Sequence, residues 1–135
     1  MIFNWGILMQ MKYWGIALAL LLPIQAKAIG YSSDYISCMN SAGNSTSSIT
    51  RCMKSEFNDQ DDRMKSLFKK TLDLYTSKEK KLQKKYQKTW LKMRSEQCGK
   101  SQKSASDTYA MKYYNCALKQ TVTRANMLEK LTYRL

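Results

Sequence analysis

The sequence predicts an all-α fold, an antiparallel helical bundle of one short and three long helices held by two disulfides. Apolar residues recur at steps of three and four over long stretches, which is the spacing of one helix face, and no segment shows useful strand alternation. The only proline is at position 23, so no proline interrupts the rest of the chain. Four cysteines, all beyond position 28, are available to link neighbouring helices.

The first 28 residues are typical of a secretory signal peptide. They contain no acid, and a lysine precedes an apolar run from Tyr13 to Leu22 and a small-residue motif at 26–28. The run is shorter than the roughly 20 apolar residues that span a bilayer, so we expect cleavage near Ala28 rather than an anchor. Translation can start at Met1 or at Met11, because both leave a complete signal. We therefore expect a signal peptide at 1–28 and a periplasmic or secreted helical domain at 29–135.

Charge and cysteine content narrow the class of domain. The formal net charge is +13, and loss of the leader with its two lysines leaves +11 on residues 29–135. An even number of cysteines in a small exported chain indicates disulfides. The chain has no histidine and no Cys-x-x-Cys pair, which argues against a metal site. We expect neither a metal nor a cofactor.

Two helices are expected before residue 76. Residues 31–41 place Tyr35, Cys38 and Met39 at helical spacing, and a loop rich in Gly, Ser, Thr and Asn follows them. From about Ser48 to Tyr75 the steps of three and four continue over seven turns. This pattern predicts a long amphipathic helix.

A capping box separates the second helix from the third. In Thr76-Ser-Lys-Glu79 the Thr hydroxyl and the Glu carboxylate satisfy reciprocal backbone amides, so a new helix begins at Ser77 and turns back antiparallel. A single helix from Ser48 to Cys98 is the alternative, since Ser and Thr do not break helices outright. The inward stripe of the helix at 77–98 is expected to contain Leu82, Tyr86, Trp90, Met93 and Gln97.

The end of the third helix brings three different side chains onto one face. Trp90, Arg94 and Cys98 recur every four residues and so lie one turn apart, on a stripe that needs a partner surface. Gly99 is expected to end this helix. After a polar loop, residues 107–133 are expected to form the last helix.

The four cysteines allow three pairings. We favour Cys38 with Cys52 and Cys98 with Cys116, because each of these bonds joins neighbouring helices across one loop. Spacing alone leaves open the pairing of Cys38 with Cys116 and Cys52 with Cys98.

Four motifs follow one another along the domain. They are Asp34-Tyr35-x-x-Cys38-Met39, Cys52-x-x-x-Glu56-x-x-x-x-Asp61-x-x-Met64-x-x-x-Phe68, Gln87-x-x-Trp90-x-x-x-Arg94-x-x-x-Cys98 and Cys116-x-x-x-x-Thr121-x-x-Arg124-x-x-x-Leu128. In this order and spacing they resemble the LprI-like family of exported bacterial proteins, named after a mycobacterial lysozyme inhibitor. The family usually has Leu-Asn at the positions of Met64-Lys65 and Tyr at that of Phe68. The resemblance implies an all-helical, disulfide-linked periplasmic or surface domain and inhibition of lysozyme.

The sequence does not assemble a catalytic site, so we do not expect an enzyme. Glu56 and Asp61 are five residues apart, which does not place two carboxylates on one helix face. Histidine, a nucleophile elbow and a phosphate-binding glycine loop are all missing from the sequence, so acid-base or covalent catalysis lacks its usual parts.

The polar and aromatic motif residues are expected to be structural. We expect Trp90 to be a core anchor, because its stripe neighbours are apolar. We expect Arg94 and Arg124 to pair with carboxylates of other helices, since a guanidinium holds a carboxylate with two parallel hydrogen bonds. The candidate carboxylates are Glu56, Asp61 and Asp34.

Two surfaces are candidates for binding. Animal-type lysozymes are strongly basic, so an inhibitor of charge +11 must present a local acidic surface. The candidate surface is the cluster of Glu56, Asp59, Asp61 and Asp62, and we expect Asp59 and Asp62 to contact lysozyme or another peptidoglycan hydrolase.

The second candidate surface is the lysine face of the third helix, which consists of Lys78, Lys81, Lys84, Lys85, Lys88 and Lys92. This face is either simply solvated or attracts anionic polymers of the cell envelope. An accessory structural protein of the envelope is a further alternative. We expect no small-molecule substrate.

Overall fold

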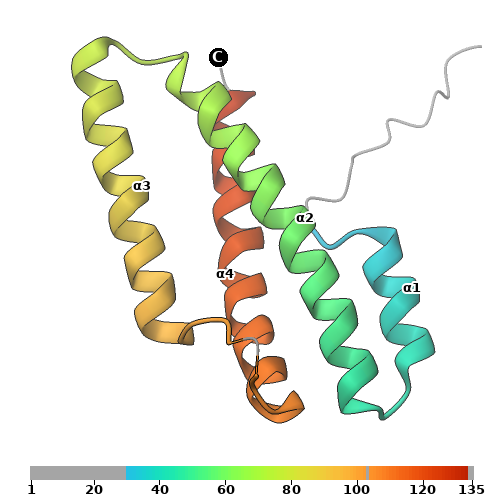
Figure 1. Cartoon of the computed structure of the whole chain (residues 1–135). Helices are drawn as coiled ribbons and strands as arrows, with labels where there is room; N and C mark the ends of the chain where they lie inside the picture. The colour runs from blue at the N-terminus through green and yellow to red at the C-terminus, as the bar shows by residue number, and fades with distance from the viewer. Residues whose placement is uncertain (1–29, 103, 134–135) are drawn as a thin grey trace, which may run out of the picture.

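The computed structural model describes residues 30–102 and 104–133, which form four α-helices and contain no strand (Figure 1). The helices are α1 (Ser33–Ala42), α2 (Thr46–Leu72), α3 (Ser77–Cys98) and α4 (Asp107–Thr132). The predicted all-α fold of one short and three long helices is confirmed. The predicted signal peptide lies outside the described residues. Among the described helices, none is apolar over enough of its length to cross a membrane.

Each helix begins at a hydroxyl side chain that accepts a hydrogen bond from a backbone amide of its first turn. The N-cap residues are Ser32, Ser45, Thr76 and Ser106. At Thr76 the capping box is complete, because the Glu79 carboxylate also accepts from the Thr76 backbone N–H at 2.8 Å. The break between α2 and α3 is therefore confirmed, and the single long helix is wrong.

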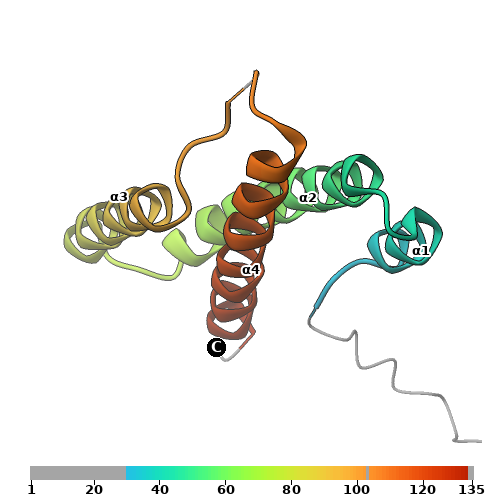
Figure 2. The same ribbon diagram turned by 90° about the horizontal axis from the view of Figure 1, so that it is seen from below.

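The centre of the fold is the pair α2 and α4, which run parallel, while α3 runs antiparallel to both (Figures 1 and 2). Hydrogen bonds join α2 and α4 at both ends, from Thr50 to the Asp107 carbonyl and between the Thr71 and Thr132 hydroxyls. Between these ends lies the apolar core. Its buried members are Met64, Leu67, Ala125 and Leu128, and the partly buried Phe68 and Trp90 pack against them.

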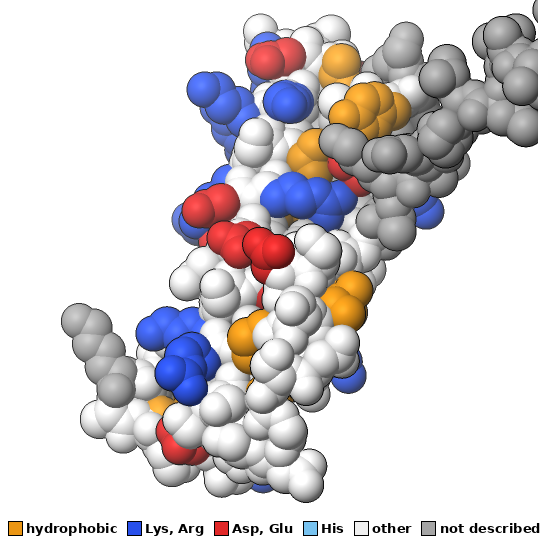
Figure 3. All heavy atoms as spheres, turned by 90° about the vertical axis from the view of Figure 1, so that its right-hand side faces the viewer, with side chains coloured by type: hydrophobic (Ala, Val, Ile, Leu, Met, Phe, Trp, Pro, Cys, Tyr) orange, Lys and Arg blue, Asp and Glu red, His pale blue; other side chains and the backbone are white. Residues whose placement is uncertain are grey.

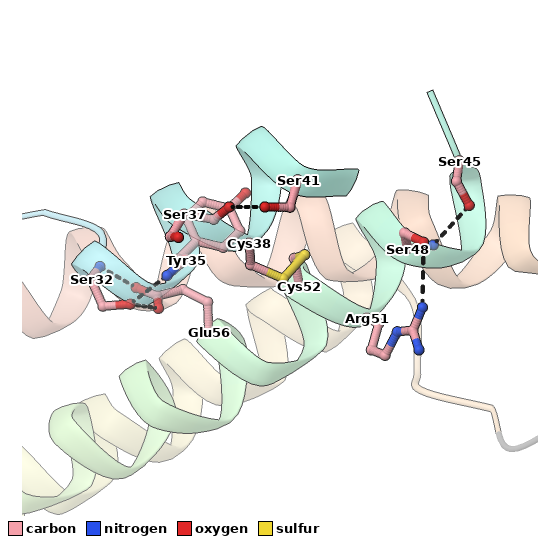
Figure 4. Close-up of a disulfide and its surroundings, with 10 residues drawn as sticks. All are labelled: Ser32, Tyr35, Ser37, Cys38, Ser41, Ser45, Ser48, Arg51, Cys52 and Glu56. Atoms are coloured by element: carbon pink, nitrogen blue, oxygen red, sulfur yellow. Dashed lines mark hydrogen bonds between the residues drawn. A yellow bond between two sulfur atoms is a disulfide. The ribbon is translucent and has the colours of Figure 1, made fainter. Parts of the chain in front are cut away.

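The short helix α1 is attached to α2 by a disulfide and a buried carboxylate (Figure 4). Cys38 bonds to Cys52, and the carboxylate of Glu56 accepts hydrogen bonds from the backbone N–H and the hydroxyl of Ser32. Gln60 donates to the same carboxylate at 2.8 Å. Glu56 is only 2 % exposed, and its partners among the described residues are Ser32 and Gln60. It was a candidate partner for Arg94 or Arg124, and neither pairs with it in the described structure.

The other predicted disulfide, Cys98 to Cys116, joins the end of α3 to α4. The favoured pairing of the four cysteines is thus confirmed. Each bridge closes a short stretch of chain and contributes about 2 to 4 kcal/mol of stability.

The expected inward stripe of α3 is wrong by about one residue of helix rotation. Leu82, Tyr86 and Met93 are 46 %, 54 % and 48 % exposed, and Gln87 is the only buried side chain that α3 contributes to the described structure. Trp90 and Gln97 of that stripe do contact the other helices. The predicted stripe of Trp90, Arg94 and Cys98 is confirmed as the face that meets α2 and α4, and Gln87 joins it. Polar groups on this face have partners on the other helices, so α3 is held mainly by hydrogen bonds and a disulfide.

Because α3 buries so little apolar surface, its order depends strongly on the Cys98–Cys116 bond. Replacing both cysteines with serine should lower the free energy of unfolding by about 2 to 4 kcal/mol. Hydrogen exchange measured by mass spectrometry should show lost protection in α3, with α2 and α4 still protected.

The matched control replaces Cys38 and Cys52 with serine, which should move the loss of protection to α1. Equal loss along α2, α3 and α4 in the Cys98 and Cys116 variant would contradict this account.

Candidate functional site

Arg94 lies where the three long helices meet. Its Nη1 donates to Asp61 Oδ1 of α2 at 2.8 Å and to Thr121 Oγ1 of α4 at 2.7 Å. The side chains of Arg94 and Asp61 are only 15 % and 14 % exposed. The structure therefore contains one of the ion pairs expected from the sequence, and this pair links α3 to α2.

Electrostatics at this junction favour the ionised carboxylate of Asp61. Burial by itself raises the pKa of Asp61, but hydrogen bonds from Lys65 and Arg94, together with their positive charges, outweigh it. The net result is a pKa of Asp61 below its ordinary value. The distance from Lys65 Nζ to Asp61 Oδ2 is 2.7 Å, so each carboxylate oxygen has a cationic partner.

Aromatic rings surround the Arg94 guanidinium. Its central carbon lies 5.1 Å from the centroid of the Trp90 ring and 5.3 Å from that of Phe57. A guanidinium at this distance from a ring face is attracted by the ring quadrupole. Trp90 thus packs at the edge of the α2–α4 core, only partly buried, and not fully inside it.

The expected ion pair of Arg124 is not formed among the described residues. The Nε and Nη2 atoms of Arg124 donate instead to the amide oxygen of Gln87, at 3.0 and 2.9 Å. Burial lowers the pKa of Arg124. Sequence reasoning missed this role of Gln87, although Gln87 stands one turn before Trp90 in the third motif.

A second inter-helix pair was also missed. Arg63 of α2 donates to Glu129 Oε2 of α4 at 2.6 Å, to Asn126 at 3.1 Å and to Gln60 at 2.9 Å. The only signal available in the sequence was that Arg63 follows Gln60 by one helical turn, which does not identify the partner on α4.

The acidic cluster expected on α2 is divided by the fold. Glu56 and Asp61 serve internal contacts, while Asp59 and Asp62 are exposed. Lys65 lies 3.5 Å from Asp62, whose side chain is 81 % exposed. Figure 3 shows acidic groups on this side of the molecule with basic groups on both sides of them. Within the predicted cluster, the exposed acids are therefore Asp59 and Asp62.

All six residues of the lysine face are exposed on α3. Of these six, only Lys92 has a carboxylate of the described residues within 4 Å, that of Glu96 at 3.6 Å. The face is therefore largely uncompensated, and its positive potential extends into the solvent.

The buried polar side chains of the junctions are satisfied by contacts within the fold. Within the described residues, every buried side-chain nitrogen or oxygen has a hydrogen-bond partner. None of the described residues form a group of three or more potential metal ligands. The chemistry offered by this arrangement is the display of fixed charged surfaces to another molecule.

Replacing Asp61 with asparagine should make stability less sensitive to acid. The pKa of Asp61 is lowered in the folded protein, so its charge stabilises the fold above the ordinary pKa of about 3.9, and this stabilisation is lost as the pH falls through the lowered value. Urea unfolding should show a loss of about 1 to 3 kcal/mol at pH 7 that shrinks towards pH 3.

The exposed neighbour provides the control for this experiment. Asp62→Asn should change the free energy of unfolding by less than about 0.5 kcal/mol at either pH. An Asp61→Asn loss of equal size at pH 7 and pH 3 would contradict the role given to the carboxylate.

Residues 38–128 match the model of a protein family described as lysozyme inhibitor LprI. No curated protein and no solved structure matches the chain. The match covers well over half of the sequence, and it includes both disulfides and the junction at Arg94. The described activity of the family is inhibition rather than catalysis. The chain belongs to the LprI lysozyme inhibitor family.

Proposed function

We propose that this protein is an exported binding protein that inhibits lysozyme or another peptidoglycan hydrolase. The observation that carries the proposal is the family match over residues 38–128, which spans both disulfides and all the contacts that hold α3 to α2 and α4. Disulfides and family membership together suggest export, where the hydrolase would be met. The signal peptide predicted from the sequence at 1–28 fits the same location.

We place the contact with the hydrolase at Asp59 and Asp62 of α2. Both side chains are exposed, and neither joins α2 to another helix in the described structure. A basic hydrolase approaching a chain with net charge +11 is repelled at long range, so its contact must be at a local negative site. Asp59 and Asp62 lie one turn apart on the same helix and supply such a site.

The assay must separate inhibition of the enzyme from masking of its substrate. Bacterial walls carry anionic polymers, and a strongly basic protein that coats them would also slow lysis in a turbidity assay. Animal and bacterial lysozymes should therefore be tested on whole cells and on a small neutral chitin oligosaccharide. Inhibition on both substrates supports the proposal, whereas inhibition on cells alone rejects it.

Neutralising the acidic pair should weaken inhibition. The double variant Asp59→Asn with Asp62→Asn removes both candidate contacts and should raise the inhibition constant on the oligosaccharide roughly tenfold or more, because close charge pairs at interfaces contribute more than about 1.5 kcal/mol.

Asp73→Lys is the matched control, because it raises the net charge by the same two units at an exposed position near the end of α2. Its inhibition constant should stay within about twofold of the wild-type value. An equal rise of the inhibition constant in the double variant and in the control would show that only net charge matters. It would rule out Asp59 and Asp62 as the docking site.

The lysine face supports a second candidate function, the binding of anionic envelope polymers or lipids. The observation that favours it is the exposure of six lysines on α3, five of them without a carboxylate of the described residues within 4 Å. Each lysine near an anionic surface contributes about 1 kcal/mol, and this attraction falls steeply with salt.

Changing Lys84 and Lys88 to glutamate should therefore weaken binding to phosphatidylglycerol vesicles by roughly tenfold or more at low salt. Changing Lys54 of α2 and Lys112 of α4 to glutamate alters the net charge equally at exposed positions elsewhere, and should have a clearly smaller effect. Cosedimentation with the vesicles at two salt concentrations measures the binding of both double variants and its dependence on salt. Equal weakening by the two double variants would assign the attraction to overall charge.

A further inference from the structure

Five apolar side chains lie exposed along the two sides of the space between α3 and α4. They are Leu82, Tyr86 and Met93 of α3 and Met127 and Leu131 of α4, and we call them the α3–α4 seam. Their exposed fractions run from 38 % to 54 %. Single exposed apolar residues are ordinary, but a line of them along two neighbouring helices is typical of a binding surface.

One end of the seam, at Met93 and Met127, borders a groove of about 440 Å³ beside Trp90. Met93 and Gln97 of α3 line one side of the groove, and Arg124 and Met127 of α4 line the other. Gln120 donates to Gln97 at 2.7 Å and closes the groove near the disulfide.

Helical spacing continues the seam beyond this groove. Tyr86 and Leu82 lie two and three turns before Met93 on the same side of α3, and Leu131 lies one turn after Met127 on α4. The α3 and α4 ribbons diverge in that direction (Figure 1). From Leu82 to Met93 the seam is about 16 Å long, which is three turns of helix.

Cations border the seam on both outer edges. Lys78 and Lys85 lie beside Leu82 on α3, and Lys119 and Lys130 lie three turns apart along α4, with Lys119 lining the groove. Arg124 adds a partly buried guanidinium whose oxygen partner among the described residues is the neutral amide of Gln87.

The two acids nearest the seam are already engaged. Glu79 takes part in the capping box with Thr76, and Glu96 pairs with Lys92. An occupant of the seam therefore meets an apolar floor with basic edges.

This charge pattern selects among possible occupants. A second copy of the chain would bring another strongly basic surface, and the leader carries two lysines and no acid, so neither is complementary. An acyl chain needs an enclosed cavity that covers most of its surface, whereas the residues of the seam are about half exposed. A helix with an apolar stripe and acidic edges fits both the length and the charge.

We propose that the α3–α4 seam binds an acid-flanked amphipathic helix of a partner protein, which occupies the position of a further long helix in the bundle. The partner covers Met93 and Met127 with its apolar stripe and pairs its carboxylates with the lysines on the two edges. The seam is built from α3 and α4, so this binding does not depend on the proposed contact of Asp59 and Asp62 with a hydrolase.

The test uses the full chain and a defined peptide. The probe is a fluorescein-labelled helix of about 18 residues with leucines at helical spacing and glutamates beside them. One control peptide replaces the glutamates with lysines, and a second has the same composition in scrambled order. Fluorescence anisotropy should show saturable binding of the acidic amphipathic peptide alone.

Single substitutions test whether the peptide binds at the seam. Met93→Glu and Met127→Glu should each weaken binding roughly tenfold or more, because both put a negative charge where the apolar stripe packs. Leu91→Glu is the matched control, since Leu91 is 38 % exposed two residues away on another side of α3. Its binding should stay within about twofold of the wild-type value. Circular dichroism establishes that each variant is folded.

Several results would overturn the proposal. Equal binding of the scrambled peptide would assign the attraction to the lysine face. Equal weakening of binding by Leu91→Glu would show that the seam is not the binding site. Failure of the acidic amphipathic peptide to bind would also reject the proposal. A dimer in sedimentation equilibrium that Met93→Glu dissociates would show that a second copy covers the seam.

Discussion

The guanidinium of Arg94 is the contact on which the position of α3 depends. It joins a carboxylate of α2 and a hydroxyl of α4 while two aromatic rings pack around it. Removing either charge leaves the other poorly solvated among packed side chains, which costs more than the pair itself contributes to stability. The junction therefore specifies one position of α3 against the α2–α4 pair, and it does so without a large apolar interface.

The fold divides its stabilisation between two kinds of contact. Met64, Leu67, Ala125 and Leu128 give α2 and α4 an ordinary apolar core. On α3, by contrast, Gln87 is the only buried side chain, and several lysines of like charge repel one another along the helix. The hydrogen bonds of Gln87 and Arg94 and the bond at Cys98 offset this repulsion. As a result, α3 can present charged and apolar side chains to solvent and still hold its place.

Features set by neighbouring residues were predictable from the sequence, whereas those set by helix rotation were not. The capping box at Thr76 and the short spans between paired cysteines are local, and they correctly gave the start of α3 and the disulfides. The long helix expected from about Ser48 to Tyr75 is Thr46–Leu72 in the structure. The inward face of α3 was misassigned because the apolar stripe with Leu82 and Met93 lies about one residue, or 100°, from the polar face that packs. The partners of Arg124 and Glu56 depend on that rotation and on tertiary contacts, so no spacing rule could have found Gln87 or Ser32.

Export and surface display are linked through the cysteines. In a reducing compartment the four cysteines are thiols, and α3 is held to α4 by side-chain hydrogen bonds without a covalent link. Oxidation outside the cytoplasm fixes the end of α3 to α4 and the middle of α1 to α2. This step adds a covalent link to the position of α3 that the Arg94 junction already specifies. The disulfides and the family both point to export, and the covalent links therefore stabilise the fold in the compartment where the proposed hydrolase partner is found.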